Sequence, residues 1–339
     1  MKFSVVASIS VLPLFVVGCD TIQQHPEQKP QLTLSQTWTA NAATGFTIGF
    51  NEPVQSVTWT WQGKSHVTTV QPASRTVHIR VSLLQGHQYS LTIDKASGDG
   101  TIPITRSRTL AGQTEQPLNT ITNPGIWQYD VARTGPFTLK FNAPIANPNQ
   151  LSSDITFNPP ISGSVVWVSP IEAEFKPDQP IGPTQVETMR IKGGVDGPVS
   201  SAGQYLVADV VRPFITQSNQ KIVVEEKNPE TLTLYKNGHV VLKSLCNTGV
   251  TGAATPLGHY YIRSQLPKAD MKGKDPDGTT YDIPDVPWVL GLFGNTAIHG
   301  YPRQKYGFPQ SNGCVELPIG TAKKLYSLVK VGTPVVVER

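Results

Sequence analysis

Two segments of the chain carry the same alternation of apolar and polar residues. The first, "GFTIGFNEPV", begins at Gly45, and the second, "PFTLKFNAPI", begins at Pro136. Every second residue near the start of each segment is large and apolar, which is the period of a strand with one buried face. Each segment is followed by a tryptophan-bearing strand and later by a further strand, so the order of elements repeats. We therefore predict two similar β units before the last third of the chain.

Both units have short predicted strands with turn residues between them, which favours a β-sandwich for each. We assign residues 31–110 to the first unit and residues 111–217 to the second. In the second unit, "FNPPISGSVVWVSP" resembles a type of immunoglobulin-like module that is common in bacterial surface proteins. The resemblance implies that both units are immunoglobulin-like domains.

Residues 218–339 follow a different pattern. Strands are predicted at 221–224, 231–235 and 239–245, and the intervening "KNG" is a hairpin turn, because Asn and Gly readily take positive φ. One helix is predicted from about 319 to 329, where apolar residues share a face, and "VGTPVVVER" is expected to form a last strand. The expected fold class is mostly β: two immunoglobulin-like β-sandwiches, followed by a β-rich domain with one short helix.

The composition supports this fold class. The 339 residues include 29 Gly and 29 Pro, and only 15% are charged, which suits short strands and many turns better than long helices. The formal net charge of +4 is small and is not gathered into runs, so nothing indicates a nucleic-acid partner.

The N-terminus has the pattern of an export signal. The apolar stretch from 3 to 17 is too short to span a bilayer comfortably but has the length of a signal-peptide core. It ends in "VVGCD", which resembles the lipobox of bacterial lipoproteins. We predict a signal peptide at residues 1–18, lipidation of Cys19 as the membrane anchor, and a polar tether over residues 19–30. The alternative is an ordinary secretory signal that contains a cysteine.

If Cys19 carries lipid, two of the three cysteines remain. Cys246 ends the apolar stretch "VVLKSLC" and is predicted to be a buried, structural thiol. Cys314 stands instead in "SNGCVELP", a context too polar and flexible for a core. We interpret Cys314 as a reactive thiol, and a disulfide with Cys246 is the alternative.

A base for this thiol is available earlier in the chain. His299 ends the strand-like segment "NTAIHG", and the loop that follows returns the chain to Cys314. A thiol beside an imidazole is a recurrent nucleophile, because the imidazole takes the thiol proton or lowers the pKa of the thiol. The flexible Gly313 lets successive backbone amides around Cys314 point at a developing oxyanion.

Several motifs together resemble the L,D-transpeptidase catalytic domain, the YkuD-like family of bacterial cell-wall enzymes. They are "AIHG", "SNGCVELP", the helix "IGTAKKLYSLV", the closing "VGTPVVV" and the upstream "TPLGHYYI", and they cover roughly residues 218–338. The resemblance implies that Cys314 attacks the bond between the third residue of a peptidoglycan stem and D-alanine. The thioester then passes the stem to the side-chain amine of another stem, which gives a 3→3 cross-link.

The resemblance also assigns roles to neighbouring groups. His299 matches the general base, the backbone carbonyl of Gly300 matches the group that orients its ring, and the N–H groups of Gly313 and Cys314 match the oxyanion site. The family needs no cofactor or metal. Its partners are peptidoglycan stem peptides, so the resemblance implies an extracytoplasmic place in the cell envelope and sensitivity to carbapenems.

The sequence departs from the family pattern at two positions. Asn312 stands where many members have a second histidine, and Glu316 stands where Asn or Arg often follows the apolar residue. Glu316 reverses a charge near the anionic donor stem. Arg303 and Lys305 are candidates for the missing cation, or are simply solvated. Ser311 either bonds within the site or stabilises the turn.

The stretch from 265 to 294 has the length and composition of a mobile flap over a pocket. Tyr281 and Trp288 are candidates to line the acyl-donor site, and packing is the alternative for each. The sequence leaves three functions open: an L,D-transpeptidase, an L,D-carboxypeptidase that uses the same Cys314 with water as acceptor, and a non-catalytic wall-binding lipoprotein.

Overall fold

The computed structural model describes residues 29–42 and 44–339. The predicted signal peptide, Cys19 and most of the predicted tether lie outside the described residues. The chain forms two compact units: residues 40–46, 80–89 and 112–339 belong to the second, and the remaining described residues belong to the first. Over the described part of the chain, the helices are too short to cross a membrane.

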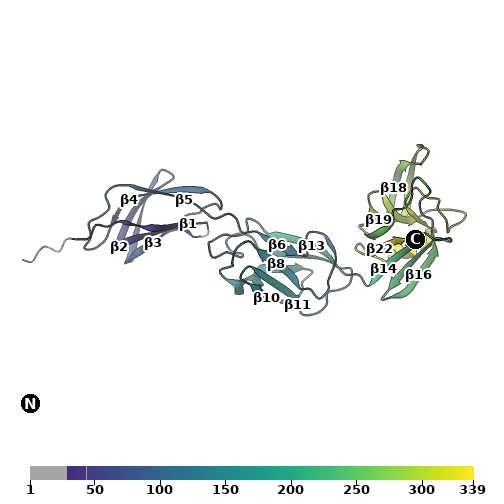
Figure 1. Cartoon of the computed structure of the whole chain (residues 1–339), viewed down its shortest axis with the longest axis horizontal. Coiled ribbons are helices and arrows are strands. Elements are labelled where there is room, and N and C mark those ends of the chain that lie inside the picture. The colour runs from purple at the N-terminus through teal and green to yellow at the C-terminus, as the bar shows by residue number, and fades with distance from the viewer. Residues whose placement is uncertain (1–28, 43) are drawn as a thin grey trace, which may run out of the picture. The chain divides into compact units, whose positions relative to one another are not determined.

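The first unit is built on long paired strands (Figure 1). The strands are β1 (Leu34–Asn41), β2 (Gly45–Trp61), β3 (Lys64–Ile79), β4 (Gln88–Ser97) and β5 (Arg108–Gln113). They pair in the order β1-β2-β4-β5, with β3 on β2, so one hydrogen-bonded network joins them all. Phe46, Ile48 and Phe50 are buried, as the alternation in β2 predicts.

Two four-stranded sheets follow, in the orders β10-β11-β8-β6 and β7-β13-β12-β9. The elements are β6 (Thr120–Asn123), β7 (Gln128–Val131), β8 (Phe137–Phe141), η1 (Pro148–Gln150), α1 (Leu151–Asp154), β9 (Ile155–Asn158), β10 (Gly163–Ser169), β11 (Glu172–Pro177), β12 (Val186–Ile191) and β13 (Val210–Thr216). Phe137 of β8 meets Phe214 of β13 edge to face, with ring centroids 5.2 Å apart. The two sheets therefore share one core, an architecture compatible with the predicted immunoglobulin-like module.

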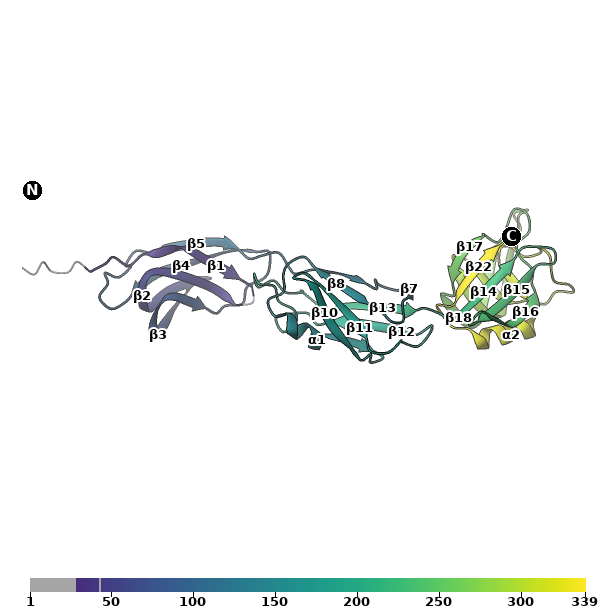
Figure 2. The same cartoon turned by 60° about the horizontal axis from the view of Figure 1, so that its bottom comes forward.

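The last part of the chain has a five-stranded sheet, a four-stranded sheet and one helix (Figure 2). The first sheet has the order β16-β15-β14-β22-β17, and the second has the order β18-β19-β20-β21. The elements are β14 (Gln220–Glu225), β15 (Thr231–Lys236), β16 (His239–Leu245), β17 (Gly258–Tyr261), β18 (Ser264–Lys274), β19 (Thr280–Phe293), β20 (Thr296–Gly300), β21 (Val315–Leu317), α2 (Ile319–Leu328) and β22 (Pro334–Glu338). The predicted strands are confirmed, and Asn237 and Gly238 have the positive φ of the predicted hairpin, 50° and 79°.

The two sheets and α2 enclose one core. Buried side chains from each meet there, among them Leu234 of β15, Ile298 of β20 and Leu325 of α2. The helix approaches β20 closely, because a Cβ atom at Gly300 would lie only 3.2 Å from the Cβ atom of Ala322. The absence of a side chain at Gly300 therefore fixes how near α2 lies to the strand that carries His299.

The predicted flap is a long antiparallel hairpin of β18 and β19, and its distal end projects from the remaining strands in Figure 1. Its turn is closed by hydrogen bonds between Asp275 and the residues Gly278 and Thr279. Asp285 and Trp288 of β19 have left-handed backbone, with φ of 54° and 57°. Such residues interrupt the regular alternation of side chains along a strand.

Candidate active site

The predicted nucleophile and base lie on neighbouring parallel strands. In the register of β20 and β21, Ile298 is opposite Val315 and His299 is opposite Glu316, and Cys314 directly precedes β21. Paired residues, and residues two apart on one strand, direct their side chains to the same face of a sheet. His299, Glu316 and Cys314 therefore share one face, where they line a pocket of about 70 Å³.

The pocket gathers most of the residues that the sequence indicates. Its lining residues are Met271, Tyr281, Ile283, Val286, His299, Tyr301, Arg303, Ser311, Asn312, Cys314 and Glu316. The apolar wall from the β18–β19 hairpin could not be predicted, because the left-handed residues in β19 hide which side chains face inward.

The environment of His299 favours its neutral form. It is 4% exposed, and its Nδ1 lies 3.2 Å from the carbonyl oxygen of Gly300. A carbonyl only accepts, so Nδ1 carries the ring hydrogen and Nε2 is left with a free lone pair. Burial lowers the pKa of His299 below 6.5, and the carbonyl of Gly300 and the charge of Glu316 oppose this effect. Nε2 is therefore available to accept a proton at neutral pH.

Cys314 is partly exposed, and its Sγ lies 3.6 Å from the carbonyl oxygen of Asn295. Burial raises the pKa of Cys314, the backbone N–H of Ala297 lowers it, and Glu316 raises it. The resting site therefore favours a neutral thiol beside a neutral imidazole, and attack by sulfur requires proton transfer to a base.

The second thiol has a different environment. Cys246 is fully buried, and burial strongly raises its pKa. Cys246 and Cys314 are both free thiols in the structure, which is the predicted arrangement rather than the alternative disulfide.

The turn before Cys314 is held from within. Gly313 has φ of +103°, a conformation that favours glycine. The Ser311 hydroxyl donates to the carbonyl of Cys314 at 2.5 Å and accepts from the Gly313 N–H at 3.3 Å. Thr255 Oγ1 lies 3.5 Å from the same Cys314 carbonyl and accepts from the N–H of Gly249 at 2.9 Å. Ser311 thus stabilises the turn, and Thr255 is a support that the sequence reasoning missed in its glycine-rich loop.

Asn312 connects this turn to the hairpin. Its Nδ2 donates to Asp275 Oδ1 at the tip of the β18–β19 pair. Burial raises the pKa of Tyr281, and nearby Cys314 and Asp275 raise it further, whereas a hydrogen bond with Asn312 lowers it. The sequence gives no sign of Asp275 as a site residue, because its contact with Asn312 spans 37 residues.

Arg303 and Glu316 form an ion pair. Arg303 Nε and Nη2 each donate to one carboxylate oxygen at 2.8 Å. Arg303, a predicted candidate for a free cation in the site, is therefore already paired with Glu316. Lys305 is exposed and does not line the pocket.

Trp288 does not line the pocket either. The ring centroids of Trp288 and Tyr326 of α2 are 5.3 Å apart, and Lys323 Nζ lies 5.5 Å from the ring centroid of Trp288. Trp288 therefore packs against α2, as the alternative prediction for this residue expected.

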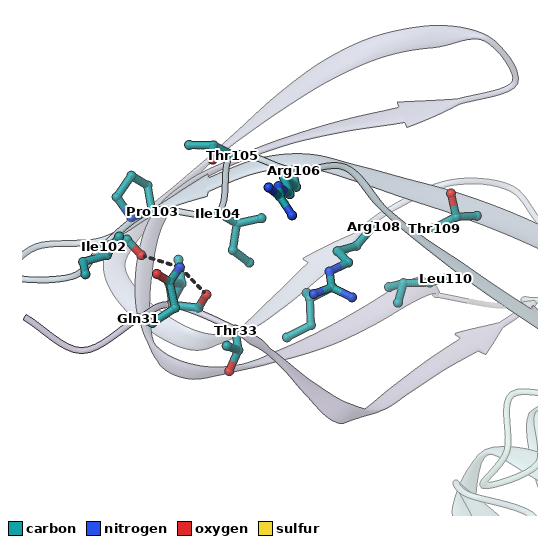
Figure 3. A pocket seen from close by; sticks show the side chains of 12 residues that line it. Gln31, Thr33, Ile102, Pro103, Ile104, Thr105, Arg106, Arg108, Thr109 and Leu110 are labelled. Atoms are coloured by element: carbon teal, nitrogen blue, oxygen red, sulfur yellow. Dashed lines mark hydrogen bonds between the residues drawn. The ribbon is translucent and has the colours of Figure 1, made fainter.

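A larger hollow in the first unit contains none of this chemistry. It has a volume of about 670 Å³, and Gln31, Ile102, Arg106 and Arg108 are among its lining residues (Figure 3). Its lining residues include no cysteine, histidine or carboxylate. Chemistry, and not size, distinguishes the pocket of Cys314.

Comparison with known families agrees with this geometry. The model of the YkuD family, described as the L,D-transpeptidase catalytic domain, matches residues 219–337. Residues 219–337 form a YkuD L,D-transpeptidase catalytic domain. The match includes β20 with His299, the turn with Cys314, and α2.

The similar proteins are named as L,D-transpeptidases, and the chain spans less than two thirds of the curated relative that it matches. The chain is 26% identical over 245 residues to L,D-transpeptidase 2 of Mycobacterium tuberculosis, which covers 67% of this chain and 58% of that protein. It is similar to a solved L,D-transpeptidase of Mycobacterium smegmatis, with 19% identity, coverage of 66% and 100%, and a TM-score of 0.37. It is also similar to the catalytic domain of the E. faecium L,D-transpeptidase acylated by ertapenem, with 30% identity, coverage of 35% and 96%, and a TM-score of 0.32.

The predicted family is therefore confirmed for residues 219–337, and the strands of the described residues confirm the predicted mostly β fold class. The number of immunoglobulin-like sandwiches and the roles of individual residues in the L,D-transpeptidase domain stay predictions.

Proposed function

We propose that the protein is a cysteine L,D-transpeptidase that forms 3→3 cross-links between peptidoglycan stem peptides. The observation that carries this proposal is the pocket shared by Cys314 and His299 within an L,D-transpeptidase catalytic domain. A neutral thiol beside an imidazole with a free Nε2 suits acyl transfer with general-base assistance.

The first half-reaction loads the donor stem onto sulfur. Cys314 Sγ attacks the carbonyl carbon between the third stem residue and D-alanine while His299 Nε2 takes the thiol proton. The C–N bond then breaks, and His299 returns the proton to the departing amine. D-alanine leaves, and the stem remains bound to Sγ as a thioester.

The second half-reaction transfers the stem. The side-chain amine of another stem's third residue attacks the thioester carbon, an amide bond forms, and the C–S bond breaks. His299 accepts the amine proton and returns it to sulfur.

The N–H groups of Gly313 and Cys314 bind the oxyanion. The Gly313 N–H makes a long bond of 3.3 Å to Ser311 in the free protein, so a substrate oxygen can replace that acceptor.

The test is mass spectrometry of the purified protein incubated with a disaccharide-tetrapeptide. A cross-linked dimer supports the transpeptidase, and a tripeptide without dimer identifies the L,D-carboxypeptidase instead. Unchanged substrate from a well-folded protein would favour the non-catalytic wall-binding lipoprotein.

Ertapenem gives a second test of the nucleophile. The E. faecium catalytic domain is described as acylated by this carbapenem, and we expect ertapenem to add to Cys314 here. The adduct should map to the peptide that contains Cys314 and be absent from Cys314→Ala. An adduct on Cys246 alone would contradict the assignment.

The location of the enzyme forms part of the proposal. Cys19 is lipidated and holds the protein at the outer side of a membrane in the cell envelope, and residues 31–110 and 111–217 place the catalytic domain near the wall. The motif "VVGCD" motivates this assignment. Labelling with a fatty-acid analogue should mark the wild type and not Cys19→Ala; an unlabelled wild type would refute the anchor.

A further inference from the structure

Glu316 is a buried carboxylate within the pocket. It is 4% exposed, and each of its oxygens accepts a hydrogen bond of 2.8 Å from Arg303. Asn247 Nδ2 also donates to Glu316, at 3.4 Å. A bidentate pair of this kind fixes the geometry of both partners. Neither charge is therefore free to act alone.

Arg303 also braces the loop between the base and the nucleophile. Its Nη2 donates to the carbonyl of Gln310 at 2.9 Å, and its guanidinium lies 4.7 Å from the ring centroid of Tyr301. One side chain thus joins the first residue after β20, the end of the loop and Glu316 of β21. The loop cannot shift without breaking these contacts.

The pair lies where its charges reach both reactive groups. Glu316 is opposite His299 in register and two residues from Cys314. Burial has the largest effect on both reactive groups; in addition, Glu316 raises the pKa of Cys314 and of His299, and Arg303 lowers that of His299. The other titratable groups around the pocket are Tyr281 of β19, Tyr301 after β20, and Asp275, which reaches the site through Asn312.

We propose that Arg303 and Glu316 are a pair of positioning residues, which hold the loop between His299 and Cys314 and cancel each other's charge beside the thiol. The inference rests on the proposed function, because it takes Cys314 as the nucleophile. It also gives Glu316 a role where the family pattern often has Asn or Arg. Glu316 is half of an internal ion pair, so it does not oppose an anionic donor stem as a lone negative charge.

The test is the pH dependence of Cys314 alkylation by iodoacetamide in the full chain, followed by peptide mass spectrometry. The quantity compared is the pH at which the alkylation rate of Cys314 is half its maximum, called the midpoint. Glu316→Gln leaves the cation of Arg303 unpaired beside the site, so the midpoint should fall. Arg303→Met leaves an unpaired carboxylate, so the midpoint should rise. Each shift should be about half a pH unit or more, and the double variant should return close to the wild-type midpoint.

Two controls separate charge balance from simple loss of structure. Arg339→Met and Glu226→Gln break the 3.1 Å pair between these residues, which does not line the pocket, and should leave the midpoint unchanged. Arg303→Lys keeps the charge without the bidentate geometry and should keep a midpoint near that of the wild type. If Arg303→Met does not fold, as judged by circular dichroism, comparing Glu316→Gln with Arg303→Lys still tests the direction of the shift. The midpoint should fall in Glu316→Gln and stay near that of the wild type in Arg303→Lys.

Shifts in the same direction, or no shifts, in folded variants would overturn the inference. Alkylation requires no stem peptide, so this result is independent of the cross-linking assay. Opposite shifts in a protein that forms no dimer would refute the proposed function alone, and dimer formation with no opposite shifts would refute this inference alone.

Discussion

Glu187, in β12, allows a quantitative prediction. The residue is fully buried, its Oε1 accepts from Gln185 Nε2 at 2.6 Å, and its Oε2 has no hydrogen-bond partner among the described residues. Burial raises its pKa from 4.5 to about 7, against the smaller opposing effect of Gln185. The folded protein therefore holds a proton at pH values where the unfolded chain has released it.

The sign of the pH dependence follows from this difference. Because the folded-state pKa is raised, folding becomes less favourable as the pH rises from 4.5 to about 7, and the loss is complete above that range. At 1.36 kcal/mol per pH unit, the whole shift corresponds to about 3 kcal/mol, most of which falls between pH 5 and pH 8. Glu187→Gln removes this titration and keeps an acceptor for Gln185.

The assay is calorimetry of wild type and Glu187→Gln at about pH 5 and pH 8. Whatever offset the amide introduces, the stability of the variant relative to wild type should rise by about 2–3 kcal/mol between these pH values, or roughly 10 °C in the melting temperature of the part of the chain that contains β12. Glu115→Gln, which changes an exposed carboxylate, should show no such change. Equal pH slopes for wild type and Glu187→Gln would refute the reasoning.

Four further predictions concern the catalytic domain. Gly300→Ala should destabilise the protein by about 1–3 kcal/mol in thermal melts, because the added methyl would lie 3.2 Å from Ala322 Cβ, 3.3 Å from Ile319 Cα and 3.4 Å from Pro287 Cγ; an unchanged melting temperature would argue against this close packing. His299→Ala should slow turnover about 10²- to 10⁴-fold, measured as dimer formation, and a wild-type rate would exclude His299 as the base. Because the pKa of His299 is lowered, the rate at which ertapenem acylates the wild type, a step that needs no acceptor amine, should not fall with His299 protonation until the pH is below 6.5. Cys314→Ala should lose all turnover and largely keep its melting temperature, because Cys314 is only partly buried at the edge of the small cluster of Val286, Val289 and Ala297.

The strands of the catalytic domain were predictable because their signals are local. Alternation, the "KNG" turn and the apolar face of α2 are each contained in a short window, and the strand at 239–245 has the predicted bounds. The helix ends at Leu328, and Val329 is its cap, one residue before the predicted end. Fraying at helix ends accounts for a difference of this size.

The site was only partly predictable because its decisive contacts depend on three-dimensional position. The order of His299 and Cys314 indicates their chemistry, but the pairing of Arg303 with Glu316 requires the loop path, which no local pattern specifies. Trp288 shows a different obstacle. Its left-handed backbone breaks the two-residue period on which counting along a strand relies, so its direction toward α2 cannot be read from its position in the sequence.

The position of β22 has a consequence for how the domain is made. This strand, Pro334–Glu338, pairs parallel with β14 and antiparallel with β17, so it joins two parts of the five-stranded sheet that have no other direct pairing in the sheet order. A ribosome delivers β14 near the start of the domain and β22 more than 100 residues later. Domains fold as units, so the nascent chain acquires its complete sheet, and with it the full support for Cys314, only when this strand has emerged.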